Sequence, residues 1–445
     1  MAIIHPFHAW RYDPTKVRLQ DVVTQPYDKI SPEMQERYYS ASPNNLVRII
    51  LGKPEAGDND DTNVYSRAAA DFKAWREQGV LRRDPAPSLY AYQQQFKVPG
   101  DPAGIRHLRT GFIALGKLHD YSEQVVHRHE QTLSKPKADR LNLLRATRAH
   151  FGQIFMLYRS SRDLVGSLVP PPTLSMKDEY GVEHRVWRIS DPKFIARLQH
   201  DMSEKKLIIA DGHHRYETAL AFQNEMRAAG AAAAAGPQGG SSESSAPWDF
   251  AMMTFVNMDS PGLVVLPTHR VVKGLESFQL SELLAKAAQW FSVEDVTSRF
   301  HADQPVDSLE GDDAPHYTYT PTLLAVSADR VHLLRAKPGV ADSALPVMDA
   351  KERQLDVVQL HKLLLENALG MTEEDIRAQK HLAYIRDPRE AVASVRSGGA
   401  QVAFLINAVR IEQIRDIAFG GGVMPQKSTD FYPKLLSGLT IYALD

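Results

Sequence analysis

A short apolar run that ends in Asp, Gly, two His and Arg constrains this chain more than any other feature. Residues 207–210 are branched and apolar, as expected of a buried strand, and Gly212 supplies a tight turn. Tyr216 and Ala219 then recur at helical spacing, so a helix should begin near His214 and pack on the sheet. A strand, a turn and a helix in this order are typical of an α/β fold.

The start of this helix is a candidate anion-binding site. Its free backbone N–H groups and the positive end of its dipole point toward whatever lies above the sheet edge. An arginine there can grip phosphate oxygens with two parallel hydrogen bonds. In the alternative, the aspartate only caps the helix and the histidines bond within the turn. The candidate residues are Asp211, Gly212, His213, His214 and Arg215.

A polar loop upstream offers a candidate proton acceptor. His127, Arg128, His129 and Glu130 follow one another. A carboxylate beside a cationic cluster can accept a hydroxyl proton during phosphoryl transfer. A solvated, salt-bridged loop is the alternative interpretation.

A metal site is a competing interpretation of the histidines. Adjacent residues on a helix diverge by about 100°, so His213 and His214 should not bind one ion together. One of them could join His127 or His129, which would suit a metal-dependent hydrolase. The chain has no cysteine, which excludes disulfides, thiolate metal sites and thiol catalysis.

Three further segments are candidates for contacts with substrate or for a lid. Residues 424–434 combine lysines, hydroxyls and aromatic rings in a loop punctuated by proline, and a packed loop with solvated lysines is the alternative. The other two segments are residues 25–28, which should form a turn, and residues 268–270, which should lie at a strand end. The candidate residues are Tyr27, Asp28, His269, Arg270, Lys427, Ser428, Thr429 and Lys434.

The 445 residues suffice for two or three domains, and strand and helix patterns alternate along them. We predict a mixed α/β (α+β) fold with an N-terminal α/β section over residues 1–85, a core over 86–271 and a C-terminal α/β section over 272–445. An Ala run followed by Gly and Ser predicts a flexible insertion over 228–247. Residues 21–30 are predicted to form a strand that enters a turn directed by Pro26. Further strands are predicted over residues 46–51, 89–98, 110–118, 153–158, 206–210, 251–258, 322–326, 330–336, 382–385 and 401–406. Helices are predicted from residue 32 behind an N-cap at Ser31 and over 65–78, 139–150, 191–202, 281–290 and 357–369.

The charge balance favours small-molecule partners over nucleic acid. The chain has 52 basic and 54 acidic residues and a net charge of -2, which argues against a general nucleic-acid binder. No apolar run approaches the roughly 20 residues of a transmembrane helix, and the N-terminus lacks the pattern of a signal peptide. We therefore expect a cytoplasmic protein without a membrane partner, and the sequence does not indicate its oligomeric state.

Five short segments, taken in order, resemble the bacterial domain-of-unknown-function 1015 family over nearly the whole chain. They are Pro26-Tyr27-Asp28, His129-Glu130 with Thr132, Asp211-Gly212-His213-His214-Arg215-Tyr216, Pro267-Thr268-His269-Arg270 and Met424-Pro425-Gln426-Lys427-Ser428-Thr429. The family resemblance names no reaction.

Residues 110–226 are also similar to the free-serine kinases of the ParB/sulfiredoxin fold, through the His-Glu loop, the helix, the apolar strand and the Asp-Gly-His-His-Arg turn. This resemblance implies a ParB/sulfiredoxin-like core, ATP or ADP as phosphate donor and Mg²⁺ as cofactor. Sulfiredoxins need a thiol that this chain lacks, and ParB proteins need a basic DNA-binding surface that we do not find in it. The implied roles are Glu130 as base with His129 beside it, His213, His214 and Arg215 as phosphate grip, and Asp211 as a catalytic residue that contacts magnesium or substrate.

The sequence therefore favours a small-molecule kinase that phosphorylates a hydroxyl, with free L-serine as the best-motivated acceptor. Lys427 and Lys434 would add positive charge if the C-terminal loop folds over the cleft. Two alternatives remain open, which are a nucleotide-binding regulatory protein without turnover and a metal-dependent hydrolase.

Overall fold

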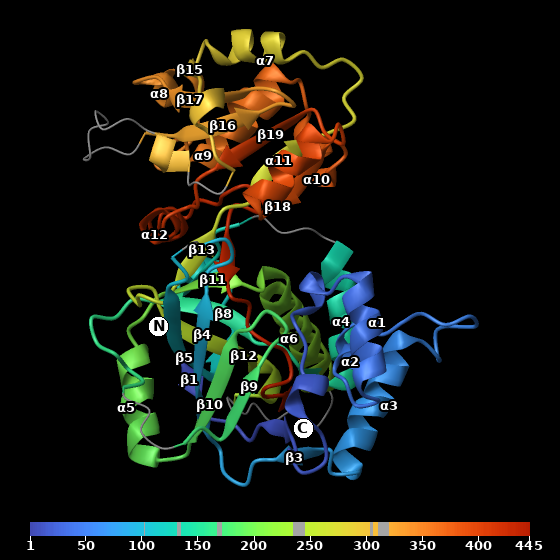
Figure 1. The fold of residues 1–445 in the computed structure, drawn as a ribbon. Helices are drawn as coiled ribbons and strands as arrows, with labels where there is room; N and C mark the ends of the chain where they lie inside the picture. The colour runs from blue at the N-terminus through green and yellow to red at the C-terminus, as the bar shows by residue number, and fades with distance from the viewer. Residues whose placement is uncertain (102, 131–134, 167–170, 235–244, 303–305, 310–319) are drawn as a thin grey trace. The chain divides into compact units, whose positions relative to one another are not determined.

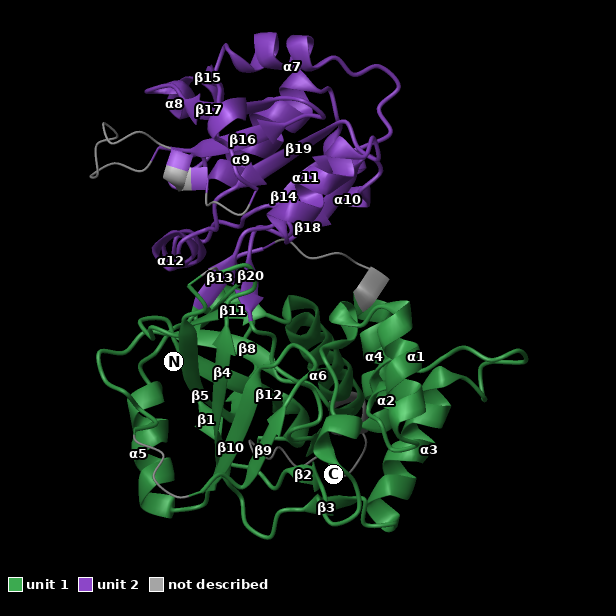
Figure 2. Ribbon diagram, viewed as in Figure 1, with its two compact units in different colours: residues 1–128, 132–263, 433–445 green, residues 129–131, 264–432 purple. Residues whose placement is uncertain are grey.

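The computed structural model divides the chain into two compact units (Figure 2). It describes residues 1–101, 103–130, 135–166, 171–234, 245–302, 306–309 and 320–445. Unit 1 comprises Met1–Arg128, Thr132–Leu263 and Pro433–Asp445, and unit 2 comprises His129–Gln131 and Val264–Tyr432. The chain therefore enters unit 2 twice, and its C-terminal segment belongs to unit 1.

A nine-stranded mixed sheet forms the centre of unit 1 (Figure 1). Its order is β6-β11-β8-β12-β5-β4-β10-β9, with β1 paired to β5. Strand β11 runs parallel to β6 and antiparallel to β8, and β12 runs parallel to β8. The strands are β1 (Ile4–His5), β4 (Leu89–Lys97), β5 (Arg106–Lys117), β6 (Val126–His127), β8 (Ile154–Tyr158), β9 (Leu174–Lys177), β10 (Glu183–Ile189), β11 (Leu207–Asp211) and β12 (Phe250–Asn257).

The helices of unit 1 pack on this sheet and on one another. Helix α6 contacts β8 and β12, α5 contacts β1, and α4 contacts both α3 and α6. The helices are α1 (Pro32–Ala41), α2 (Val47–Ile50), α3 (Val64–Glu77), α4 (Lys135–Thr147), α5 (Pro192–Met202) and α6 (His213–Ala234), with 3-10 turns η1 (Leu19–Asp21), η2 (Tyr27–Lys29), η3 (Tyr121–Glu123) and η4 (Pro247–Asp249). Two small antiparallel pairs complete the unit, namely β2 (Trp10–Tyr12) with β3 (Leu81–Arg83) and β7 (Ala149–His150) with β21 (Tyr442–Ala443).

One apolar core holds both the strand and the helix that carry the Asp-Gly-His-His-Arg turn. Ile209 of β11 and Tyr216 of α6 are fully buried in the same cluster, together with Met156 of β8 and Phe255 of β12. Burial of these side chains fixes the turn against the edge of the sheet.

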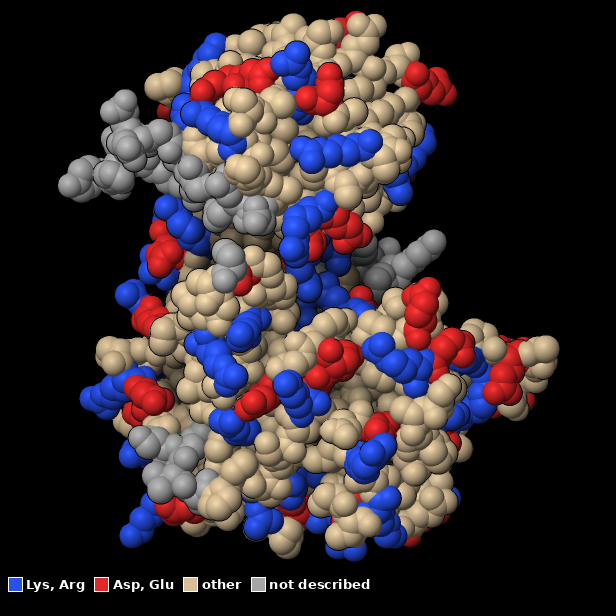
Figure 3. Space-filling view, viewed as in Figure 1, with Lys and Arg blue, Asp and Glu red and all other residues tan. Residues whose placement is uncertain are grey.

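Unit 2 is built on an antiparallel six-stranded sheet of order β15-β17-β16-β19-β14-β18. These strands are β14 (His269–Val272), β15 (Phe291–Asp295), β16 (Thr322–Val326), β17 (Val331–Ala336), β18 (Leu382–Ile385) and β19 (Val402–Ile406), and β13 (Val264–Leu266) pairs with β20 (Asp430–Tyr432). The helices are α7 (Leu280–Ala287), α8 (Val340–Ala344), α9 (Asp356–Gln359), the π-helix η7 (Leu360–Ala368), α10 (Glu373–Ala378), α11 (Pro388–Arg396) and α12 (Ile411–Phe419), with 3-10 turns η5 (Thr297–Arg299) and η6 (Val306–Leu309). Basic and acidic side chains are interspersed on the face of each unit that Figure 3 shows.

Most of the predicted elements are present. The hairpin of β4 and β5 is confirmed, as are the strands β8, β11, β12 and β16 to β19. Ser31 caps α1 by accepting a hydrogen bond from Met34 N at 3.2 Å, as predicted. Helix α6 continues through the first part of the predicted insertion to Ala234, in line with the high helix propensity of alanine. Residues 235–244 lie outside the described residues.

Two predicted strands of unit 1 are wrong. Residues 46–51 contain helix α2, because the Asn45 side chain accepts a hydrogen bond from Val47 N at 2.9 Å and starts a helical turn. Residues 21–30 form only an isolated bridge from Thr24 to Ser437 in place of the predicted strand. The turn predicted at the proline is present, because η2 follows Pro26, which has a φ of -56° and lacks an N–H for a strand ladder. Over the described residues, no helix combines the length and the apolar character that crossing a membrane requires.

Candidate functional site

The predicted turn joins β11 to α6 in unit 1. Strand β11 ends at Asp211, and α6 begins at His213, so Asp211 lies in the strand and not in the first turn of the helix. Gly212 turns the chain at a φ of 92°, which favours glycine. A Cβ at this position would also lie 2.9 Å from Nε of Arg215, whose guanidinium folds back over the glycine. Only glycine satisfies both requirements without strain.

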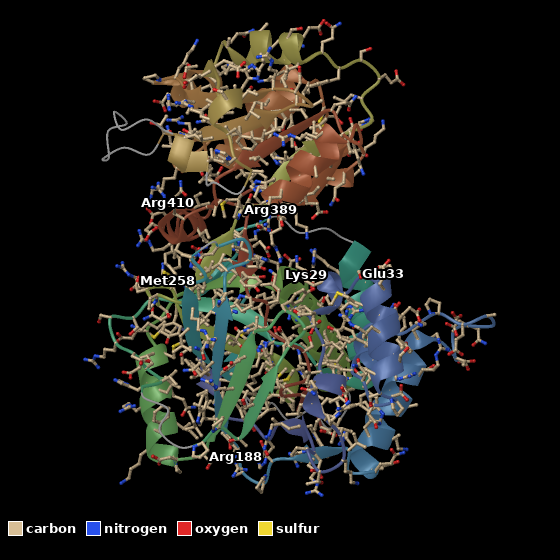
Figure 4. All side chains as sticks on the ribbon, in the orientation of Figure 1. Lys29, Glu33, Arg188, Met258, Arg389 and Arg410 are labelled. Carbon is tan, nitrogen blue, oxygen red and sulfur yellow. The ribbon has the colours of Figure 1, made fainter. Side chains whose placement is uncertain are left out.

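Asp211 is the negative centre of a small charge cluster. Its Oδ2 accepts a hydrogen bond from Nη2 of Arg215 at 2.6 Å, and its Oδ1 accepts one from Nζ of Lys434 at 2.8 Å. Burial alone would raise the pKa of Asp211, but the charges of Lys434 and Arg215 outweigh it and hold that pKa well below its usual range. Lys29, labelled in Figure 4, adds a third positive charge in the same direction.

The position of Lys434 depends on two polar side chains of the sheet. Nε2 of Gln94 donates to the carbonyl of Lys434 at 2.9 Å, and Arg109 donates to the carbonyl of Pro433. Nε of Arg109 also donates to Oε1 of Gln94 at 3.0 Å. Arg109 is 1% exposed, and burial lowers its pKa to about 10. Neither residue was predicted to belong to the site, and Arg109 lies just before the predicted strand 110–118, whereas β5 begins at Arg106.

Arg215 has a second contact besides Asp211, because its Nη1 donates to the carbonyl of Gln153. It also lines a hollow of about 70 Å³ in unit 1, to which the predicted residue Tyr27 contributes. The neighbouring Asp28 is exposed. Within unit 1, the structure thus brings Tyr27, Arg215 and Lys434 to one region, although the sequence separates them widely.

Glu130 belongs to unit 2, where a chain of hydrogen bonds orients it. Its Oε1 accepts from the backbone N of Thr429 at 2.8 Å and from the Thr429 hydroxyl at 2.9 Å. Because that hydroxyl donates its proton to the carboxylate, Nε2 of His129, 2.7 Å away, must donate to the hydroxyl oxygen. His129 is fully buried, with its ring edge-on to Phe431. The segments 129–130 and 424–429 are therefore neighbours, as the sequence could not show.

Arg270 anchors the same C-terminal loop within unit 2. Its Nη2 donates to the carbonyl of Lys427 at 3.1 Å, and its Nε lies 3.2 Å from Nε2 of His361. Burial lowers the pKa of Arg270 to about 10. Lys427 is exposed at a φ of 60°, and Ser428 closes the turn by donating to the carbonyl of Pro425 at 2.6 Å.

His269 is buried next to Arg270 at the start of β14. Its Nδ1 accepts a hydrogen bond from Ile406 N at 3.3 Å, and burial lowers its pKa to about 4. The roles predicted for His269 and Arg270 in substrate contact stay predictions.

Of the histidines in the metal hypothesis, His129 is hydrogen bonded to Thr429, and His213 and His214 begin α6. His127 is buried in β6 with its Nε2 3.1 Å from the carbonyl of Gln124. In the part of the chain that the structure describes, no group of three or more His, Asp or Glu side chains is arranged to hold a metal ion. The magnesium contact and the hydrolase remain hypotheses.

The fold and the first cluster define a mixed α/β protein with a positively charged strand–turn–helix site. The family described as protein of unknown function (DUF1015) matches residues 4–358. The chain belongs to this family, as its short segments predicted.

Solved structures give three examples of similarity. A conserved hypothetical protein from Pyrococcus furiosus is 12% identical, with 72% of this chain and 92% of that chain covered and a TM-score of 0.34. A free serine kinase in complex with AMP is 13% identical, with 71% of this chain and 89% of that chain covered and a TM-score of 0.32. A mutant free serine kinase in complex with ADP is 12% identical, with 71% of this chain and 89% of that chain covered and a TM-score of 0.33. No curated protein sequence matched this chain significantly.

Proposed function

We propose that this protein is a nucleotide-dependent phosphotransferase that uses ATP or ADP to phosphorylate the hydroxyl of a small molecule. The observation that carries the proposal is the charge cluster at the turn between β11 and α6. One carboxylate, Asp211, is held there by Arg215 and Lys434, with Lys29 as a third cation. This excess of positive charge lies at the start of a helix, where backbone N–H groups also favour anions. A phosphoryl group would balance it.

In this proposal, Arg215 and Lys434 bind phosphate oxygens, and Asp211 orders the two cations. Both oxygens of Asp211 already accept hydrogen bonds from charged groups, so this carboxylate does not fit the role of a direct magnesium ligand. Magnesium carried by the nucleotide would offset part of the phosphate charge.

We assign the role of proton acceptor to Glu130. Its Oε1 accepts both hydrogen bonds from Thr429, which leaves Oε2 outside the hydrogen bonds found among the described residues, and the carboxylate also interacts electrostatically with Arg270. The carboxylate is thus held in one orientation with one oxygen available. Such a group suits a general base, because a base must be positioned within hydrogen-bond reach of the proton it takes.

Phosphorus NMR of the purified protein with magnesium, ATP or ADP and a panel of hydroxyl compounds tests the proposal. Free L-serine heads the panel because residues 110–226 resemble the free-serine kinases. A new phosphomonoester signal is expected. General-base catalysis contributes about 100-fold or more, so Glu130→Gln should lower the rate by at least about that factor and leave nucleotide binding intact.

The matched control is Glu282→Gln, at an exposed position on α7, which should keep the wild-type rate. A wild-type rate in Glu130→Gln would contradict the assignment of the base. Nucleotide binding without any product would contradict the phosphotransferase and favour a regulatory protein.

A further inference from the structure

Unit 1 contains a hollow that shares Arg215 with the charge cluster, while its other lining residues have no proposed phosphate contact. It offers about 70 Å³ and is bordered by α4, α6 and the turn η2. This volume exceeds the ~10–15 Å³ that one water needs, so the hollow has room for a group larger than one water. Arg215 forms part of its wall and is also hydrogen bonded to Asp211. A ligand in the hollow therefore lies next to the residues proposed to bind phosphate.

The walls of the hollow are largely apolar. Leu144 and Phe151 are buried there, and the ring of Tyr27 faces the Arg140 guanidinium at 4.1 Å. Arg140 is fixed, because its Nη1 donates to the carbonyl of Ile50 at 2.6 Å and its Nε donates to Asp139 at 2.8 Å. A rigid aromatic and guanidinium surface suits a planar ring, which stacks on such surfaces.

One residue of the wall, Thr218, carries a polar atom without a partner among the described residues. The Thr218 hydroxyl is buried, and among the described residues it makes no hydrogen bond. A helical threonine commonly donates to the carbonyl four residues earlier, and this one does not. Thr218 follows Arg215 by three residues on α6, so both side chains lie on the same helix face. An unsatisfied buried hydroxyl is unfavourable for the folded protein unless a ligand satisfies it.

We propose that this hollow binds the heteroaromatic base of a nucleotide and that the Thr218 hydroxyl hydrogen-bonds to the edge of the base. The inference rests on the proposed function in one respect, namely that the phosphates of the same nucleotide lie at Arg215 and Lys434. Tyr27 and Arg140 supply the stacking surface, and Thr218 supplies the polar contact that a saturated apolar group could not use.

Calorimetric titration of the full chain with AMP, ribose 5-phosphate and adenosine tests the pocket. AMP should bind at least about tenfold more tightly than ribose 5-phosphate, which lacks the base. Thr218→Val preserves the shape and removes the hydroxyl. It should weaken AMP about threefold to tenfold, the effect of one hydrogen bond, and leave ribose 5-phosphate unchanged. The control Thr218→Ser should stay within about twofold of wild type.

Protein stability provides an independent readout. Because the hydroxyl has no partner in the protein, Thr218→Val should unfold at the same temperature as wild type or higher. Saturation-transfer NMR of adenosine should show its base protons closest to the protein. Equal affinity for AMP and ribose 5-phosphate, or an equal loss of both in Thr218→Val, would overturn the inference.

These measurements separate the two proposals. Base-dependent binding without phosphotransfer would contradict the proposed function and support the proposed base-binding hollow. Phosphotransfer together with equal affinity for AMP and ribose 5-phosphate would support the proposed function and contradict the proposed base-binding hollow.

Discussion

Replacing Lys434 by methionine would remove one of the two cations that are hydrogen bonded to Asp211. The Nζ to Oδ1 distance is 2.8 Å, and the side chains of Lys434 and Asp211 are 10% and 19% exposed. At an effective dielectric constant of about 20, the Coulomb energy of such a pair is roughly 6 kcal/mol. Desolvation offsets most of it, and Arg215 still holds the other oxygen at 2.6 Å in the variant. We therefore expect a coupling of about 2 kcal/mol between Lys434 and Asp211.

Urea unfolding followed by tryptophan fluorescence can measure this coupling. Four of the five tryptophans, Trp10, Trp75, Trp187 and Trp248, belong to unit 1, and the fifth belongs to unit 2. The signal therefore reports mainly on the unit that contains the pair. The double-mutant cycle combines Lys434→Met with Asp211→Asn, and the exposed Lys206→Met is the matched control.

The pH dependence of the free energy of unfolding shows in which direction the Asp211 carboxylate changes stability. The pKa of Asp211 is lowered in the folded protein, so its stabilising contribution is complete above the ordinary aspartate pKa of about 3.9 and is lost as the pH falls toward the folded value. In Lys434→Met that pKa should rise toward the ordinary value, so the loss of stability on acidification should be smaller and should be complete at a higher pH. If the two single changes add within about 0.5 kcal/mol at pH 7, the assignment of the charge cluster is refuted.

Two further predictions concern Gly212 and His269. Gly212→Ala should destabilise unit 1 by about 1–3 kcal/mol and weaken AMP binding, because the new Cβ displaces Arg215. Gly230→Ala, in open space on α6, should be stabilising by up to about 1 kcal/mol, and equal melting temperatures for the two variants would contradict this prediction. Burial lowers the pKa of His269 to about 4, so unfolding takes up a proton and stability should fall by up to about 3 kcal/mol between pH 6.5 and pH 4. Calorimetry of His269→Gln should show a smaller change over that range, and an unchanged slope would exclude His269 as the cause.

Local patterns in the sequence predicted the strand, turn and helix of the site because short-range physics determines them. The apolar residues before Asp211 form a buried strand, and Gly212 is needed where the backbone takes a positive φ. The same reasoning failed at residues 46–51, where an apolar run fits a strand and a helix equally well. A single side chain, Asn45, decides that case in favour of the helix.

The partners of the predicted residues were beyond the reach of such patterns. Asp211 and Lys434 are 223 positions apart, and Glu130 and Thr429 are 299 apart. The sequence marked all four as candidates but contained no signal that paired them. Each pairing follows from the long-range course of the chain, because residues 433–445 return to unit 1 whereas residues 129–131 belong to unit 2. Periodicity and capping describe only neighbours along the chain.

Arg109 is a buried cation whose contacts support the site. Enclosing a guanidinium in the interior is unfavourable, and an apolar side chain of similar volume would avoid the desolvation cost. The arginine is nevertheless 1% exposed, with a backbone carbonyl, an amide oxygen and the Phe155 ring at 4.8 Å around it. Those contacts fix the backbone at Pro433, and from there Lys434 reaches Asp211. The charge at the turn therefore depends on a buried cation in β5, and an inward-facing arginine in an apolar strand is a sign that the sheet supports a site.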